Sequence, residues 1–197
     1  MDNERIRKQF EFIKEIDKEK LIKRRNYISD GVTRENDAEH AWHMAMMAIL
    51  LSEYSDEPID VLKTVTMILA HDLVEIKAGD TYAYDEQAKL SQRERELEAA
   101  DAIFSMLPED QGKKLRALWD EFEEGQTAEA RFAAAMDRTQ PLVLHDLTEG
   151  KAWVENGINL AQVTKRVSAI AKASGTLYEF AYENIVVPHV ERGNIRQ

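Results

Sequence analysis

Signals that start helices recur along the whole chain, and they constrain its fold more than any other feature. A capping residue followed three positions later by Glu satisfies the first backbone N–H groups of a helix, and Pro favours the first turn. Such starts stand at Asn36 with Glu39, Ser91 with Glu94, Pro108 and Thr127. No segment has the alternation, turn pairs or β-branched density of a convincing sheet. The sequence therefore predicts an all-α fold, a single helical bundle.

Apolar periodicity between these signals gives the expected helix bounds. The helices are expected over residues of about 4–25, 36–51, 58–74, 91–106, 108–125, 127–144, 159–173 and 177–191. The segment 41–51 is apolar nearly all round, which predicts a central helix, and Pro188 is expected to kink the last one. We find no internal repeat and no linker rich in Pro, Gly and Ser, so residues 1–197 are expected to form one domain.

Composition narrows the chemistry. The chain has 197 residues and no cysteine, so any metal must be held by His, Asp or Glu. Its formal net charge of −11 disfavours nucleic-acid polymers and anionic membranes as partners, since both normally require a basic face. A small anionic substrate would need a local cation. The charged N-terminus lacks the apolar core of a signal peptide, and we expect a cytoplasmic protein.

The adjacent pair His71-Asp72 lies inside an apolar run, where ionisable groups are costly to bury unless they are paired or bind a metal. His40 on the preceding helix and Asp137 on a later one can face this pair. Two nitrogen and two oxygen ligands suit a divalent ion such as Mn, Co, Fe, Ni, Zn or Mg. For each histidine taken alone, a hydrogen-bonded core residue is the competing interpretation, and the combination favours a metal site. His145 and His189 belong to no recognisable motif, and Trp153 is interpreted as a packing residue.

In their order along the chain, His40, His71-Asp72 and Asp137 resemble the ligands of the HD-domain metal-dependent phosphohydrolases. The stretches 35–40 (Glu-Asn-Asp-Ala-Glu-His), 71–81 (His-Asp-Leu-Val-Glu-Ile-Lys-Ala-Gly-Asp-Thr) and 137–142 (Asp-Arg-Thr-Gln-Pro-Leu) are similar to its 5'-deoxynucleotidase-like branch. The resemblance covers most of the chain. It implies a metal-binding core at about 24–146, C-terminal helices at about 159–192 and an HD-type bundle that often dimerises, which makes a homodimer the expected state.

The resemblance also implies roles for individual residues. Glu75, one turn beyond the His-Asp pair, is expected to be catalytic together with Asp72, although a salt bridge is the plainer interpretation of Glu75. A segment comprising Asp80, Thr81 and Tyr82 is expected to contact the substrate. Arg24 or Arg25 is expected to hold the phosphate, because arginine can bind it through two hydrogen bonds. Matching the flanking residues favours Arg24. Arg25 then occupies the position at which characterised deoxynucleotidases carry a bulky aromatic residue. In those relatives the aromatic side chain disfavours substrates with a ribose 2'-hydroxyl. Both arginines can also be interpreted as partners of a helix C-terminus.

The function predicted from these features is a metal-dependent phosphomonoesterase that releases phosphate from nucleoside or deoxynucleoside 5'-monophosphates. One metal is expected, because dinuclear members of the superfamily need additional histidines and none lies between Asp72 and Asp137. Three alternatives stay open: hydrolysis of another small phosphate ester, a guanosine tetraphosphate hydrolase, and a helical module that binds a nucleotide without turning it over. Ile76 after Glu75 disfavours the second, and the intact Glu75 and Asp80 disfavour the third.

Overall fold

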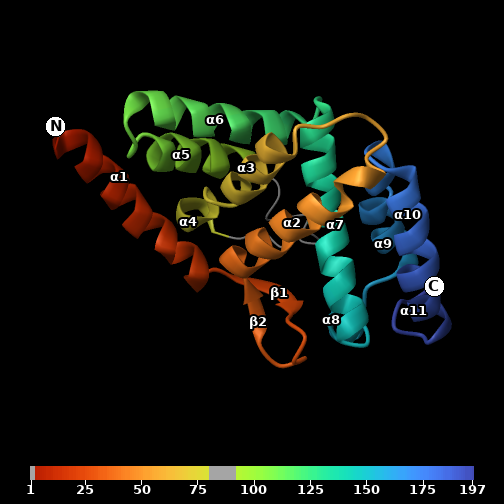
Figure 1. The fold of residues 1–197 in the computed structure, drawn as a ribbon. Coiled ribbons are helices and arrows are strands. Elements are labelled where there is room, and N and C mark those ends of the chain that lie inside the picture. Colours follow the sequence, from red (N-terminus) through yellow and green to blue (C-terminus); the bar gives the residue numbers. More distant parts are fainter. Residues whose placement is uncertain (1–2, 80–91) are drawn as a thin grey trace.

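A computed structural model describes residues 3–79 and 92–197, which form an assembly of helices with one small two-stranded sheet (Figure 1). The elements are α1 Asn3–Ile16, β1 Lys23–Tyr27, β2 Arg34–Asn36, α2 Asp37–Leu51, α3 Val61–His71, α4 Glu75–Ala78, α5 Gln92–Phe104, α6 Glu109–Glu124, α7 Ala128–Leu147, α8 Lys151–Asn156, α9 Leu160–Val167, α10 Gly175–Ala181 and α11 Val187–Glu191. The predicted all-α fold class is confirmed.

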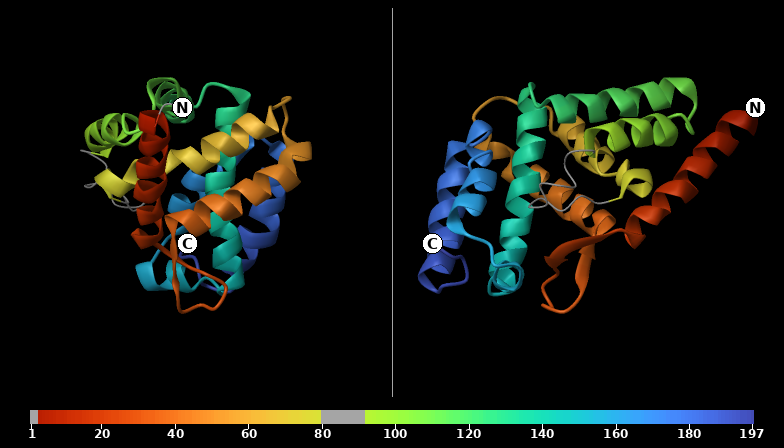
Figure 2. Two further views of the ribbon diagram at one scale, coloured as in Figure 1. Left: turned by 60° about the vertical axis from the view of Figure 1, so that its left-hand side comes forward. Right: turned by 180° about the vertical axis from the view of Figure 1, so that it is seen from behind.

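Helix α7 stands near the middle of the molecule (Figure 1, Figure 2). On one side lie α1, α5 and α6, and on the other lie α9, α10 and α11, while α2 and α3 cross between them. A large apolar cluster containing Met44, Phe132 and Trp153 joins α2, α3 and α7 to the C-terminal helices. A second cluster around Trp119 joins the end of α3 to α5, α6 and α1. In the described residues no helix has both the length and the apolar character needed to cross a membrane.

Several of the predicted helix starts are confirmed by their hydrogen bonds. The Asn36 side chain accepts from the backbone N–H of Glu39 at 3.0 Å, and the Glu39 carboxylate accepts from the backbone N–H of Asn36 at 3.0 Å. Thr127 caps α7 by accepting from Ala130, and α6 ends at the left-handed Gly125. The capping box at Asn36 fixes the start of α2, and with it the position of His40 one turn later.

The predicted first helix is wrong at its C-terminal end. Helix α1 ends at Ile16, a 3-10 turn follows over Asp17–Leu21, and residues 23–27 form the strand β1. This strand pairs antiparallel with β2, with Lys23 opposite Asn36 and Tyr27 opposite Arg34. The guanidinium of Arg34 stacks on the Tyr27 ring at 3.6 Å. The paired residues are 7 to 13 positions apart in sequence, so local periodicity did not reveal the sheet.

Three further helix predictions need correction. The helix expected over 58–74 is shorter at both ends: α3 runs from Val61 to His71, a turn through Asp72 follows, and a separate helix, α4, starts at Glu75. The short helix α8 was not expected. Helix α2 is not buried all round, because Trp42, Met46, Ile49 and Leu50 form an exposed apolar stripe on it. Near Pro188 the chain forms a π-helical segment, Tyr182–Val186, before α11. The predicted start at Ser91 lies outside the described residues.

Candidate metal centre and cavity

Four separate elements bring the expected metal ligands together. His40 lies on α2, His71 is the last residue of α3, Asp72 follows it in the turn, and Asp137 lies on α7. One ligand atom from each of His40, His71 and Asp72 falls within 4.8 Å of the others. Asp137 Oδ1 lies 3.2 Å from His40 Nε2. All four side chains are buried, so the folded chain gathers ionisable groups that are far apart in sequence.

Hydrogen bonds behind the two histidines direct one ring nitrogen of each toward the cluster. His71 Nδ1 donates to the carbonyl of Ile68 at 2.6 Å, which leaves Nε2 as the nitrogen with a lone pair. This Nε2 is buried and lies 3.1 Å from Asp72 Oδ1, inside the cluster. His40 Nδ1 donates to Gln140 Oε1 at 2.9 Å, so its Nε2 also presents a lone pair, toward Asp137. Both nitrogens are therefore oriented as metal ligands.

The charge balance of the cluster also favours a cation. Burial, with a further contribution from Arg24, lowers the pKa of His40 well below its usual value, so its ring is neutral at neutral pH. A neutral nitrogen and the Asp137 carboxylate oxygen, both acceptors, then face each other at 3.2 Å. Burial also acts to lower the pKa of His71, but the Asp72 carboxylate outweighs it and the net direction is upward. The negative charge of Asp72 can be balanced by a proton on His71 or by a metal ion bound to both residues. Binding of the metal ion displaces the proton from His71.

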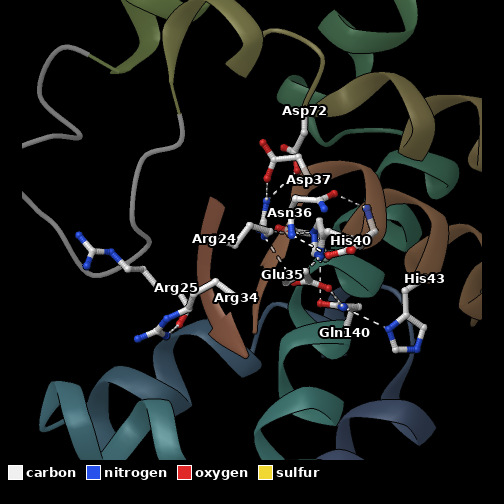
Figure 3. Close-up of polar contacts among 12 residues, drawn as sticks. Arg24, Arg25, Arg34, Glu35, Asn36, Asp37, His40, His43, Asp72 and Gln140 are labelled. Atoms are coloured by element: carbon white, nitrogen blue, oxygen red, sulfur yellow. Dashed lines mark hydrogen bonds and ion pairs between the residues drawn. The ribbon is translucent and has the colours of Figure 1, made fainter. Parts of the chain in front are cut away.

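Arg24 occupies the centre of a second layer of charge (Figure 3). Its Nη1 donates to Asp37 Oδ1 at 3.0 Å and to Asp72 Oδ2 at 2.9 Å, and its Nη2 lies 3.9 Å from Asp137 Oδ1. Burial alone would raise the pKa of Asp72, but His71 and Arg24 lower it overall, so this ligand is ionised. Arg24 thus bridges two of the four expected ligands.

Arg25 points away from this layer (Figure 3). Successive side chains of a strand point to opposite faces, so on β1 the half-buried Arg24 turns inward while Arg25 is exposed. Both arginines line the same cavity, Arg25 at its outer edge. The strand thus separates two neighbouring residues that the sequence left as alternatives.

A cavity of about 320 Å³ opens from the metal cluster. Near the cluster it is lined by His71, Asp72, Glu75 and Asp137 and by four arginines, Arg24, Arg25, Arg138 and Arg166. Arg138 forms an ion pair with Asp137 Oδ2, and Arg166 Nη2 lies 3.9 Å from the same oxygen. Burial and the neighbouring Arg166 lower the pKa of Arg138 to about 9, which still leaves it charged at neutral pH. The four arginines share the cavity lining with five carboxylates, Asp72, Glu75, Glu96, Glu123 and Asp137, so cations and acids alternate around the metal cluster.

Sequence reasoning missed several of these residues. Glu35, Asp37, Arg138 and Gln140 were quoted within the motifs but received no role. Gln140 links His40 to Glu35, and burial raises the pKa of Glu35 to about 7. Only their closeness to the ligands in sequence could have drawn attention to them. Arg166 on α9 carried no sequence signal. The predicted substrate residues Asp80, Thr81 and Tyr82 lie outside the described residues.

This fold and this cluster define a helical protein with a centre suited to a metal ion. The chain belongs to the HD domain family, whose sequence profile matches residues 16–177. The family resemblance inferred from the motifs is confirmed.

The comparisons also identify individual relatives. The human protein named 5'-deoxynucleotidase HDDC2 is 30% identical over 138 residues, which span 70% of this chain and 66%, just under two thirds, of the human protein. The protein of the same name from Dictyostelium discoideum is 30% identical over 157 residues, spanning 76% of this chain and 83% of that protein.

A solved structure from Magnetospirillum magnetotacticum MS-1, described as a predicted metal-dependent phosphohydrolase, superposes with a TM-score of 0.93. It is 44% identical to this chain, and the match covers 98% of this chain and 96% of that one. A conserved hypothetical protein from Pyrococcus furiosus, 21% identical with a TM-score of 0.65, shares the fold; the match covers 88% of this chain and 97% of that one.

Gln140→Leu is expected to weaken binding of Co²⁺ or Mn²⁺ about 10- to 100-fold, because His40 loses the acceptor that orients its ring. Isothermal titration calorimetry of the metal-free protein measures this affinity. Gln111→Leu is the control. The Gln111 side chain on α6 accepts a hydrogen bond from Gln9 and forms none with the metal cluster. Equal metal affinities for Gln140→Leu and the wild type would refute the orienting role.

Proposed function

We propose that this protein is a metal-dependent phosphomonoesterase that removes phosphate from nucleoside or deoxynucleoside 5'-monophosphates. The observation that carries the proposal is the arrangement of the cavity: a buried cluster with the ligand chemistry of a divalent ion adjoins four arginines. The name 5'-deoxynucleotidase, which both eukaryotic relatives carry, supports a nucleotide as the substrate, and the bacterial structure at 44% identity supports a phosphohydrolase.

We assign His40, His71, Asp72 and Asp137 as ligands of one divalent ion, with Mn, Co, Mg, Fe, Ni and Zn as the candidates. The lone pairs of His40 and His71, with the buried Nε2 of His71 beside Asp72 Oδ1, fit such an ion. When bound, a divalent ion supplies Lewis-acid polarisation of phosphate and water. The remaining steps belong to side chains of this chain.

Arg24 is assigned to phosphate binding. Its guanidinium lies between Asp37 and Asp72 and lines the cavity, which holds its position and orientation before substrate arrives. Preorganised cations stabilise the charge that develops on a phosphoryl group in the transition state. We assign Arg25, which also lines the cavity, to the sugar side of the substrate. Asp80, Thr81 and Tyr82 remain assigned to substrate contact from the family resemblance.

Glu75 is assigned to proton transfer. It begins α4, lines the cavity beside Asp72, and a hydrogen bond with Glu75 contributes to the pKa of Asp37. Burial is the main influence on Asp37 and raises its pKa to about 7. A carboxylate in this position can take a proton from the attacking water and give one to the leaving oxygen.

Purified protein loaded with Mn²⁺, Co²⁺ or Mg²⁺ is expected to release phosphate from at least some of the eight common ribo- and deoxyribonucleoside 5'-monophosphates. Chelation with EDTA is expected to abolish the release, and added metal is expected to restore it, because the proposed reaction depends on the ion. A colorimetric phosphate assay measures both effects. The absence of release from every nucleotide with every metal would reject the proposed activity and favour a module that only binds nucleotides.

Glu75→Gln is expected to lower kcat by about 10²- to 10⁴-fold while leaving metal affinity unchanged, because the amide cannot transfer the proton and is not a ligand. Steady-state kinetics and calorimetric metal titration measure the two quantities. Glu123→Gln, which changes another glutamate of the same cavity, serves as the control and is expected to retain most of the activity. Full activity in Glu75→Gln would remove Glu75 from the mechanism.

The homodimer and the cytoplasmic location stay predictions. Trp42, Met46, Ile49 and Leu50 on α2 are between 40% and 65% exposed, and contiguous apolar surface of this kind is typical of protein contacts. If two copies meet through α2, Met46→Glu is expected to shift the mass from dimer to monomer. Light scattering coupled to size exclusion measures the mass, and a monomeric wild type would reject the homodimer.

A further inference from the structure

The end of the cavity farther along α7 differs from the metal end. Its lining comprises Leu142 and His145 from α7, Trp153 from α8, and Val163 and Val167 from α9. These side chains form an apolar wall that contains one imidazole. Apolar walls with a few placed polar groups are typical of sites for small organic ligands.

His145 is a buried side chain whose ring forms no hydrogen bond with the residues that the structure describes. Its Nδ1 is buried and has no partner in residues 3–79 and 92–197, and its ring packs against Trp153 with the centroids 4.3 Å apart. More than nine tenths of buried polar groups in proteins are hydrogen-bonded, so such an exception calls for an explanation. Because the ring lines the cavity, a bound molecule can supply the missing partner.

A second histidine on the same tryptophan provides an internal comparison. His189 is also buried against Trp153, with ring centroids 5.2 Å apart. Both of its nitrogens have partners: Nε2 lies 3.3 Å from Asp146 Oδ1, and Nδ1 lies 2.9 Å from Asn194 Nδ2. His189 does not line the cavity. Of the two histidines on Trp153, the one that faces the cavity is the one that lacks partners.

The charge state of His145 indicates the chemistry of its ligand. Burial, followed by the positive charge of Arg166, lowers the pKa of His145 to about 3, so the ring is neutral at physiological pH. A neutral imidazole offers one donor and one acceptor and no charge to attract a phosphate. It suits the polar edge of an uncharged heteroaromatic ring.

The spacing along α7 connects the two ends of the cavity. His145 lies eight residues after Asp137, which corresponds to about 12 Å along the helix axis. Pro141 and Leu142 lie between them on the same wall. An extended mononucleotide with its phosphate near Asp137 therefore reaches His145 with its base.

We propose that His145 is a base-recognition residue: the apolar end of the cavity binds the heteroaromatic base of a nucleotide, and the base edge hydrogen-bonds to the His145 ring. Leu142, Val163 and Val167 contact the base, and Trp153 holds the imidazole in place. This inference rests on the proposed nucleotide substrate. It adds a binding site for the base, which is the part of a nucleotide that a sugar phosphate lacks.

Kinetics with two kinds of substrate test the proposal. His145→Phe keeps a planar ring and removes both hydrogen-bonding atoms, and it is expected to raise KM for nucleoside 5'-monophosphates about three- to tenfold, as the loss of one neutral hydrogen bond predicts. The KM for ribose 5-phosphate, which has no base, is expected to stay unchanged, as is kcat. His145→Gln, which retains a donor and an acceptor, is expected to restore most of the nucleotide affinity. Equal effects on both substrates, or none on the nucleotide, would overturn the assignment.

A binding experiment separates this proposal from the phosphatase activity. If the wild type releases no phosphate from any nucleotide, the proposed function fails, and calorimetric titration with adenosine, guanosine, cytidine and uridine still tests His145. At least one nucleoside is expected to bind the wild type and to bind His145→Phe more weakly. The absence of binding by all four, or equal binding by both proteins, would overturn the inference. Circular dichroism and thermal unfolding check that each variant is folded.

Discussion

The burial of several carboxylates around one arginine is the interaction on which the rest of the site depends. Asp37 lies on α2, Asp72 in the turn after α3 and Asp137 on α7, and each lies within 4.0 Å of the Arg24 guanidinium. Carboxylates brought this close repel one another at low dielectric constant unless cations lie among them. Arg24 supplies one such charge, and the arrangement of His40 and His71 suits a second, from a metal ion. Because the groups lie on β1, α2, α7 and the turn after α3, their mutual attraction also fixes how these elements meet.

The small hairpin delivers Arg24 to this position. Strand β1 is paired with β2, which leads directly into α2, so the arginine and the first acid of α2 are placed by one local unit. The Arg34 guanidinium, from the paired strand β2, stacks on the Tyr27 ring, and Lys151 Nζ from α8 lies 4.2 Å from the centroid of the same ring. The strand also separates Arg24 from Arg25, which a helix would have placed about 100° apart on one surface. A change of secondary structure over five residues therefore decides which arginine enters the cluster.

The cavity is polar at one end and apolar at the other, and α7 runs along both. Asp137 and Arg138 mark the charged end, and Leu142 and His145 mark the other, so one helix contributes side chains to both ends of the cavity. Residues at such spacing share a helix face, which gives the wall its continuity. At the apolar end the lining is completed by α8 and α9, whose packing on α7 depends on the larger apolar cluster.

The sequence by itself determined the helical class, most helix starts and the candidate ligands, because capping boxes, apolar periodicity and the His-Asp motif act over a few residues. His40, His71, Asp72 and Asp137 were all identified before the structure, and the structure brings them together. Only the tertiary structure decided that residues 23–27 are a strand, that the chain turns at Asp72, and that Arg166 and His145 line the same cavity. Strand pairing and cavity walls are made by contacts between residues distant in sequence, and their energies depend on neighbours that no local pattern encodes.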